Sequence, residues 1–185
     1  MSYGSNDRAD GNCSGNDSIN KECAEMNMKK IYSVLVENRS GVLSKVAGLF
    51  SRRSFNIDSL TVGETEDRAV SCMTIVSSGD ERTLEQIEKQ LNKKLDVIRI
   101  KTFEEQMSVS RELMLIKVKY NKTNRREIME TCQAMKADIV DMSKNLMIIQ
   151  ICDTPERTSQ MIKLLSGISI VEIARTGTLA LQKCE

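Results

Sequence analysis

The chain has 185 residues, which is enough for one medium domain or two small ones. Its 27 basic and 26 acidic residues give a net charge of +1, so no excess of one charge can attract nucleic acid or an anionic membrane, and no apolar run is long enough to cross a bilayer. The absence of histidine removes the usual general base and the commonest metal ligand, and the scarcity of aromatic residues argues against stacking on nucleic-acid bases.

Residues 1–27 differ from the rest of the chain. They are rich in Ser, Asn, Asp and Gly, net acidic, and nearly free of large apolar side chains. This composition fits neither a secretory signal, which needs an apolar core, nor a transit peptide, which is rich in Arg and poor in acids. We expect a disordered acidic leader, with the folded part beginning at Met28.

From Met28 the apolar spacing switches between periods of about 2 and 3.6 residues, which indicates strands and amphipathic helices. The expected order is strand, helix, strand, strand, helix, strand, with strands over residues 31–37, 56–64, 69–77 and 95–102. The first helix, over 42–53, groups its apolar residues on one face: Val42, Leu43, Val46, Leu49 and Phe50. The second follows a capping signal at Ser78 or Asp80 and buries Leu84, Ile87 and Leu91.

After a polar connector at 104–111 the same order returns. A strand is expected over 112–120, a helix over 124–135, and a hairpin of strands 138–142 and 146–152. Thr154 caps the next helix, with Pro155 at its first position, and Gly167 ends that helix before the last strand, over 168–175.

Both halves therefore read β-α-β-β-α-β, the ferredoxin-like order, and the fold class is α+β. The predicted divisions are a leader (1–27), a first domain (28–104), a linker (105–110), a second domain (111–180) and a tail (181–185). Helices cover only one face of each sheet, and the strands carry apolar residues on both faces. We therefore expect a homodimer.

The six cysteines form no C-x-x-C pair, which argues against a metal or redox site and favours a reducing, cytoplasmic setting. Cys72, Cys132 and Cys152 lie in apolar patterns and are predicted to be buried. Five methionines have core spacing and are predicted to fill the core: Met129, Met135, Met142, Met147 and Met161.

The turn from Glu37 to Gly41 is the strongest candidate for a binding site. A glycine at a helix start lets a ligand approach, and the N–H groups of Val42 and Leu43 suit a carboxylate. The amide of Asn38 can bond an ammonium or a carboxylate. Three further contributions are predicted: Leu43 and Ile57 line an apolar cavity for a branched side chain, and Asn56 completes the polar ring across a dimer contact.

Simpler explanations exist for the same residues. Ser40-Gly41 is also an ordinary helix cap with a turn glycine, and Asn56 is also an ordinary strand start. Other ferredoxin-like functions lack their signals: the strand at 69–75 has no aromatic residue for RNA, the first loop has no cysteine pair for a metal, and Asn38 and Arg39 are the only hint of an acylphosphatase. A small-molecule regulatory module remains.

Several motifs are familiar. These segments resemble the regulatory small subunit of acetohydroxyacid synthase, also called acetolactate synthase: 30–43, 48–53, 56–62, 84–91 and 170–177. The resemblance covers about residues 28–180. The acidic leader is not part of the family pattern, and residues 121–123 lack the glycine-rich turn that some members carry.

The resemblance implies an N-terminal ACT domain and a second domain of related topology, with no catalytic residue, metal or cofactor of their own. It implies a partner, the catalytic subunit, which makes acetolactate from pyruvate with thiamine diphosphate, magnesium and FAD. It further implies feedback inhibition by valine, or another branched-chain amino acid, bound between ACT domains of paired subunits. The family's effector contacts fall on Asn38, Gly41, Val42, Leu43, Asn56 and Ile57.

Three alternatives stay open. The sequence is also compatible with an ACT regulator of another enzyme, with a transcription regulator that carries an ACT-like module, and with a self-contained enzyme of ferredoxin-like fold. No helix-turn-helix with a basic face is visible in the sequence, which speaks against the second.

Overall fold

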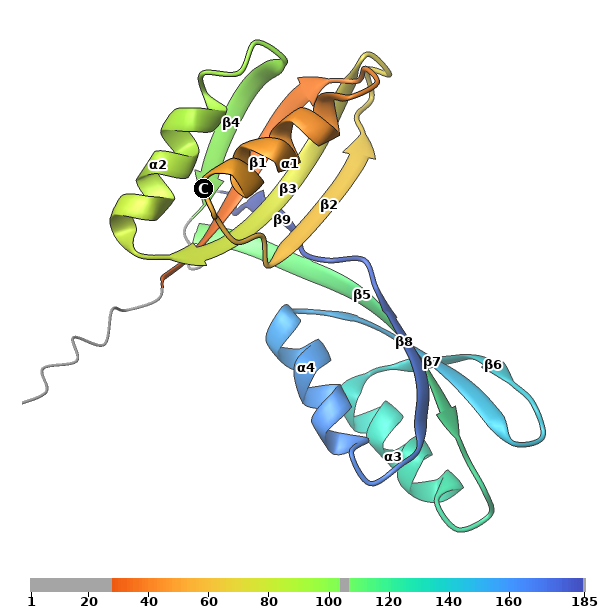
Figure 1. The fold of residues 1–185 in the computed structure, drawn as a ribbon. Helices are drawn as coiled ribbons and strands as arrows, with labels where there is room; N and C mark the ends of the chain where they lie inside the picture. Colours follow the sequence, from red (N-terminus) through yellow and green to blue (C-terminus); the bar gives the residue numbers. More distant parts are fainter. Residues whose placement is uncertain (1–27, 104–106, 185) are drawn as a thin grey trace, which may run out of the picture.

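The computed structural model describes residues 28–103 and 107–184, so the predicted leader lies outside the described residues. Two β-α-β-β-α-β halves follow each other along the chain, and in each a sheet carries two helices on one face (Figure 1). The predicted α+β class with two ferredoxin-like halves is confirmed. None of the helices in the described residues is long and apolar enough to cross a membrane.

The first half forms an antiparallel sheet in the order β2-β3-β1-β4. Its elements are β1 (Met28–Glu37), α1 (Val42–Arg52), β2 (Ser59–Glu64), β3 (Val70–Gly79), α2 (Glu81–Leu91) and β4 (Val97–Phe103). Alternate β1 residues face the helices and join a core with both of them; its members include Tyr32, Val34, Val36, Val46, Leu49, Phe50, Ile87 and Leu91. β2 begins three residues later than expected, because residues 53–58 form a connector in which Phe55 packs edge-on against Phe50.

The second half repeats the arrangement, in the order β6-β7-β5-β8. Its elements are β5 (Ser108–Lys119), α3 (Arg125–Met135), β6 (Asp138–Met142), β7 (Leu146–Asp153), α4 (Pro155–Leu164), β8 (Ile170–Arg175) and β9 (Leu179–Gln182). A separate core lies between this sheet and its helices; its members include Met114, Ile116, Ile128, Met147, Ile149, Met161 and Leu165. Each half thus has its own apolar core.

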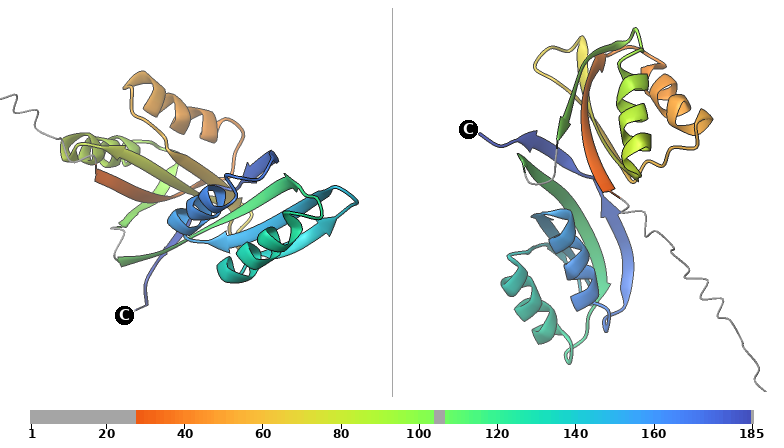
Figure 2. Two further views of the ribbon diagram at one scale, coloured as in Figure 1. Left: turned by 90° about the horizontal axis from the view of Figure 1, so that it is seen from below. Right: turned by 90° about the vertical axis from the view of Figure 1, so that its left-hand side faces the viewer.

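The strand β5 also pairs with the C-terminal strand, β9. It begins at Ser108, inside the segment expected to be a connector, and residues 108–111 pair with β9, which was not predicted. Ala180 of β9 is buried against Ile31, Val76 and Phe103, on the face of the first sheet that the helices leave open. The right-hand view of Figure 2 shows β9 on the opposite side of β1 from α1 and α2. The C-terminal strand therefore packs against the first half.

Several cysteines and methionines are less buried than predicted. Cys132 is buried, but Cys72 is half-buried and Cys152 is exposed. Cys152 pairs with Leu113 on the uncovered face of the second sheet, so its apolar neighbours do not imply a covering layer. Met129 and Met142 are also exposed, at 44% and 42%. The predicted core filling holds for the other three: Met135, Met147 and Met161.

Candidate functional site

The first turn of α1 has the features of a small anion site. Gly41 is its N-cap, with a left-handed φ of 86° and no side-chain capping bond. A Cβ built on Gly41 meets no atom within 4 Å, so the space above the glycine is open. Among the described residues, no backbone acceptor takes the N–H of Leu43 or Ser44. Free N–H groups at a helix start, at its positive end, favour a carboxylate.

Asn38 lies beside this turn and is held in place by the β2–β3 hairpin. Its backbone N–H donates to the Ala69 carbonyl at 2.7 Å, and its Nδ2 donates to Arg68 O at 2.9 Å and Glu64 Oε1 at 3.2 Å. The donor of the side chain is therefore used within the protein. No donor of the described chain reaches its Oδ1, which can therefore accept from a ligand and suits an ammonium rather than a carboxylate.

Val42 and Leu43 point in different directions, although both were placed on the apolar face of the helix. Val42 is buried in the first core, whereas 44% of Leu43 is exposed. Leu43 is thus available to a ligand or to another subunit, and Val42 contributes its backbone only.

Asn56 and Ile57 lie at the other end of the same half. Asn56 Nδ2 donates to Asp58 Oδ1 at 2.5 Å, its carbonyl accepts from Ser77 Oγ, and Ile57 packs at the edge of the first core. Ser77 pairs with the start of β1, whereas Asn38 follows the end of β1. Ser77 pairs with Lys30, so at about 3.3 Å per residue the two groups are roughly 26 Å apart along β1. Within one chain, the structure brings together Asn38 to Leu43, but not Asn56 and Ile57.

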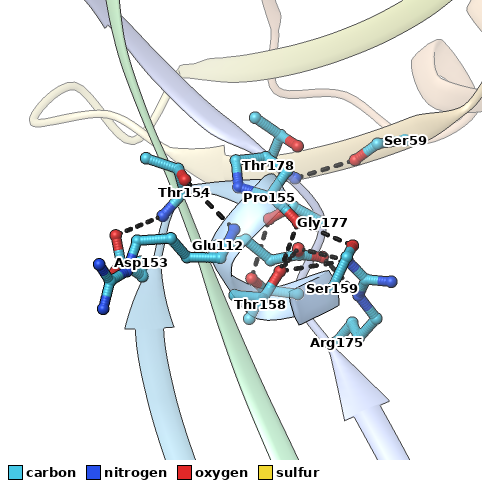
Figure 3. Close-up of polar contacts among 12 residues, drawn as sticks. Ser59, Glu112, Asp153, Thr154, Pro155, Thr158, Ser159, Arg175, Gly177 and Thr178 are labelled. Atoms are coloured by element: carbon cyan, nitrogen blue, oxygen red, sulfur yellow. Dashed lines mark hydrogen bonds and ion pairs between the residues drawn. The ribbon is translucent and has the colours of Figure 1, made fainter. Parts of the chain in front are cut away.

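A second polar cluster, which the sequence did not predict, lies where the two halves meet (Figure 3). Arg175, at the end of β8, donates from Nε to Glu112 Oε1 at 2.9 Å and from Nη2 to Glu112 Oε2 at 2.6 Å. Thr158 of α4 adds a bond to Glu112 Oε2 at 2.9 Å. Only 5% of Glu112 is exposed. The only signal in the sequence was a carboxylate directly before four apolar residues, Leu113 to Ile116.

The charges of this cluster stabilise each other. Burial raises the pKa of Glu112, but hydrogen bonds from Arg175 and Thr158 outweigh it and hold the pKa below its usual value. The bond to Glu112 raises the pKa of the Arg175 guanidinium. The pair is thus ionised at neutral pH and joins β5 to β8 and, through Thr158, to α4.

Next to this cluster the chain crosses closely over β2. Thr178 N–H donates to Ser59 Oγ at 2.9 Å, and Thr61 Oγ1 donates to the Thr176 carbonyl at 3.1 Å. Between these bonds, Gly177 has a φ of 86°, and a Cβ there would lie 2.7 Å from Ser59 Oγ. A cleft of about 720 Å³ adjoins the crossing and is lined by Asp58, among others. The Asn56–Asp58 segment therefore lies next to the contact between the halves.

The comparisons with known proteins cover both halves. Residues 32–99 match the family described as AHAS small subunit-like ACT domain, and residues 111–184 match the family described as small subunit of acetolactate synthase. The acetolactate synthase small subunit of Mycolicibacterium smegmatis is 47% identical, over 82% of this chain and 89% of that protein. The acetolactate synthase isozyme 3 small subunit of Escherichia coli is 41% identical, over 84% of this chain and 96% of that protein.

A solved structure shows the same arrangement of both halves. The crystal structure of the acetolactate synthase small subunit from Thermotoga maritima has a TM-score of 0.80 and 38% sequence identity, and the match covers 85% of this chain and 99% of that one. The similarity thus extends from the first strand of the described chain to its last.

Proposed function

The chain belongs to the family of acetolactate synthase small subunits, and from this premise we propose that it is a non-catalytic regulatory subunit with two effects on the catalytic subunit of acetolactate synthase. It activates that subunit, and it makes the enzyme sensitive to feedback inhibition by valine or another branched-chain amino acid. Thiamine diphosphate, magnesium and FAD would belong to the catalytic partner, and the complex would work in the cytoplasm.

The first turn of α1 is the feature that best supports an amino-acid effector. The effector's carboxylate would accept hydrogen bonds from the N–H groups of Leu43 and Ser44, and its ammonium would donate to Asn38 Oδ1. The exposed Leu43 side chain would contact a branched aliphatic group. One methylene more or less there changes the free energy of binding by about 1–3 kcal/mol, so such a site separates related amino acids only partly.

The separation of Asn56 and Ile57 from this turn supports a site made by two copies of the chain. In the part of the chain that the structure describes, β2 lies at the sheet edge and pairs only with β3, and Val62 on it is exposed. If two copies pair about a two-fold axis with their α1 helices antiparallel, Asn56 and Ile57 of one copy come beside Asn38 and Leu43 of the other. The effector pocket would then exist only in the homodimer.

An effector of this kind acts through the difference in its affinity for two states. A typical coupling is about 1–3 kcal/mol, which corresponds to an affinity ratio of roughly 5 to 150. A pocket closed between two copies supplies such a difference, because the effector binds only one pairing geometry. The proposal therefore predicts that valine strengthens self-association of the chain.

The test uses the chain together with its catalytic subunit. Asn38→Ala removes the ammonium acceptor and Gly41→Asp places a carboxylate where the effector's carboxylate would lie, so both variants should lose inhibition by valine and keep activation. Gln133→Ala, which removes an exposed amide in the second half, is the control and should keep both responses. Full valine sensitivity in both site variants would exclude this site, and pyruvate turnover by the purified chain alone would exclude the non-catalytic role.

A further inference from the structure

A basic pocket lies at the end of the second half that points away from the first half (Figure 1). It has a volume of about 860 Å³, and its charged lining comes from four residues: Lys119, Lys122, Arg125 and Lys144. These residues are contributed by the end of β5, the β5–α3 loop, the first position of α3 and the β6–β7 turn. Tyr120 and Leu146 provide an apolar wall.

The charge of this pocket is not balanced by its surroundings. No acidic residue lines it, although the whole chain carries nearly equal numbers of basic and acidic residues. Among the described residues, none of the four cationic side chains makes an ion pair or a hydrogen bond. Nearby basic residues do pair, as in Arg126 with Glu130 and Lys117 with Glu172. Four like charges therefore surround one hollow without a counter-ion from residues 28–103 or 107–184.

The backbone around the pocket is held by several hydrogen bonds. Asn121 Oδ1 accepts from the N–H groups of Thr123 and Asn124, and Asn124 Oδ1 accepts from the N–H of Asn121 at 2.7 Å. The Tyr120 hydroxyl donates to the Ser143 carbonyl at 2.5 Å and so joins the β5–α3 loop to the β6–β7 turn. The β5–α3 loop and the β6–β7 turn thus fix the positions from which the cations extend.

We infer that the basic pocket binds a small multivalent anion with linked phosphate groups. Four cations around one hollow match several negative charges better than a single carboxylate, and phosphate oxygens accept from both ammonium and guanidinium groups. A recessed volume of this size suits a small molecule rather than the flat surface of a protein. Tyr120 and Leu146 would contact the uncharged part of such a ligand. The inference does not depend on the proposed function.

The experiment is a calorimetric titration of the full-length chain with sodium triphosphate. Triphosphate should bind at low ionic strength and more weakly at about 0.15 M salt, because the attraction is electrostatic. Sulfate at equal ionic strength should compete poorly. In ¹⁵N–¹H spectra, the shifted amides should be confined to residues 119–125 and 143–146.

Matched variants separate this pocket from general attraction. Lys122→Gln and Lys144→Gln change exposed side chains without internal partners, so both should fold normally and each should weaken triphosphate binding about tenfold. Lys163→Gln, the control, removes an exposed lysine of the cleft between the halves and should bind triphosphate as tightly as the unaltered chain does.

The inference is overturned if triphosphate does not bind at low ionic strength, or if Lys163→Gln weakens triphosphate binding as much as the two pocket variants do. It is also overturned if Lys122→Gln impairs only the association with the catalytic subunit, which would indicate an acidic protein surface instead. All three variants should keep their valine response, so this test fails or succeeds separately from the proposed function.

Discussion

Gly41 and Gly177 share a left-handed backbone with a φ of 86° but differ in their surroundings. A Cβ at Gly41 would meet nothing within 4 Å, whereas one at Gly177 would collide with Ser59 Oγ and Thr61 Oγ1. Substitution of Gly41 therefore strains only the backbone. Substitution of Gly177 also pushes the new Cβ against the two hydroxyl oxygens of β2. The two positions allow these effects to be measured separately.

Two alanine substitutions in one helix should change stability in opposite directions. Gly41→Ala should lower the free energy of unfolding by about 1 kcal/mol, because an L-residue is disfavoured in the left-handed region. Gly48→Ala should raise it by about 0.5–1 kcal/mol, since Gly48 lies inside α1 and its Cβ would meet only Arg52 Nη2, at 3.8 Å. Urea denaturation of both variants measures the difference, and a destabilised Gly48→Ala would contradict it.

Glu112 should make stability depend on pH in acid. Its pKa is lowered in the folded state, so its contribution to stability is present above the unfolded pKa of about 4.3 and is lost as the pH falls through the folded pKa. Glu112→Gln should therefore cost about 2–3 kcal/mol at pH 7, and that cost should shrink as the pH is lowered toward 3. Denaturation of both proteins across this range tests it, and a cost that does not change with pH would show that the carboxylate charge is not involved.

The candidate site shows what single residues reveal in a sequence. The turn at Gly41 was predicted because its ligand-binding groups are neighbours in the chain. The Glu112–Arg175 pair was not predicted, because its partners are 63 positions apart. Asn56 was expected to contribute across a dimer contact, and within one chain it lies far from Asn38. The distance of Ile57 from Leu43 was not visible, since motif similarity gives the identity of contacts and not the copy that supplies them.

At the scale of elements, local signals placed the helix starts well. Asp80 rather than Ser78 caps α2, with its side chain accepting from the Thr83 N–H, and Thr154 caps α4 with Pro155 at the first position, as predicted. These signals depend on neighbours within one turn. The end of α4 was less accurate: the helix stops at Leu164, before Gly167, which has no left-handed φ.

The cap of α4 can be tested directly. Thr154→Ala removes the acceptor for the Arg157 N–H and should lower the free energy of unfolding by about 1 kcal/mol. Thr123→Ala, at an exposed loop threonine, should change it by less than about 0.5 kcal/mol. Thermal denaturation of the two variants compares them, and an equal loss in both would show that the cap contributes nothing specific.

The strand β9 marks the limit of local prediction. Apolar and polar residues do not alternate in its four-residue sequence, and the side chains of Leu179 and Leu181 are exposed. Nothing in the segment itself therefore indicates a strand. What makes it a strand is pairing with residues 108–111, far away in the sequence. The same pairing extends β5 into the expected connector. The order of helices and strands and the core residues of both halves could be predicted from periodicity. The contact between the two halves could not.

At the scale of the whole molecule, the halves contact each other through the packing of Ala180 of β9 on the first sheet and through the crossing of Gly177 over β2. The crossing lies beside the Glu112 cluster on one side and near the segment of Asn56 on the other. If two first halves pair as proposed, a change in that pairing would be transmitted to the second half at this crossing.

Gly177→Ala should loosen this crossing. The new Cβ would lie within 3 Å of two hydroxyl oxygens of β2, so we expect a loss of about 2 kcal/mol in the free energy of unfolding, together with weaker inhibition at saturating valine but little change in valine affinity. Gly167→Ala, where a Cβ meets nothing within 4 Å, is the control. Calorimetry and activity of the reconstituted enzyme measure the two effects. Loss of valine affinity with unchanged maximal inhibition would refute a role in transmission.

The late position of β9 also has a consequence for synthesis on the ribosome. Ile31, Val76 and Phe103 are complete in the nascent chain long before Ala180, the residue that covers them, is translated. At about 5–20 residues per second, this apolar patch stays uncovered for on the order of several seconds. During that interval the first half of the nascent chain is prone to aggregation or to binding by chaperones. In a truncated chain that ends before residue 179, the apolar patch would stay uncovered permanently.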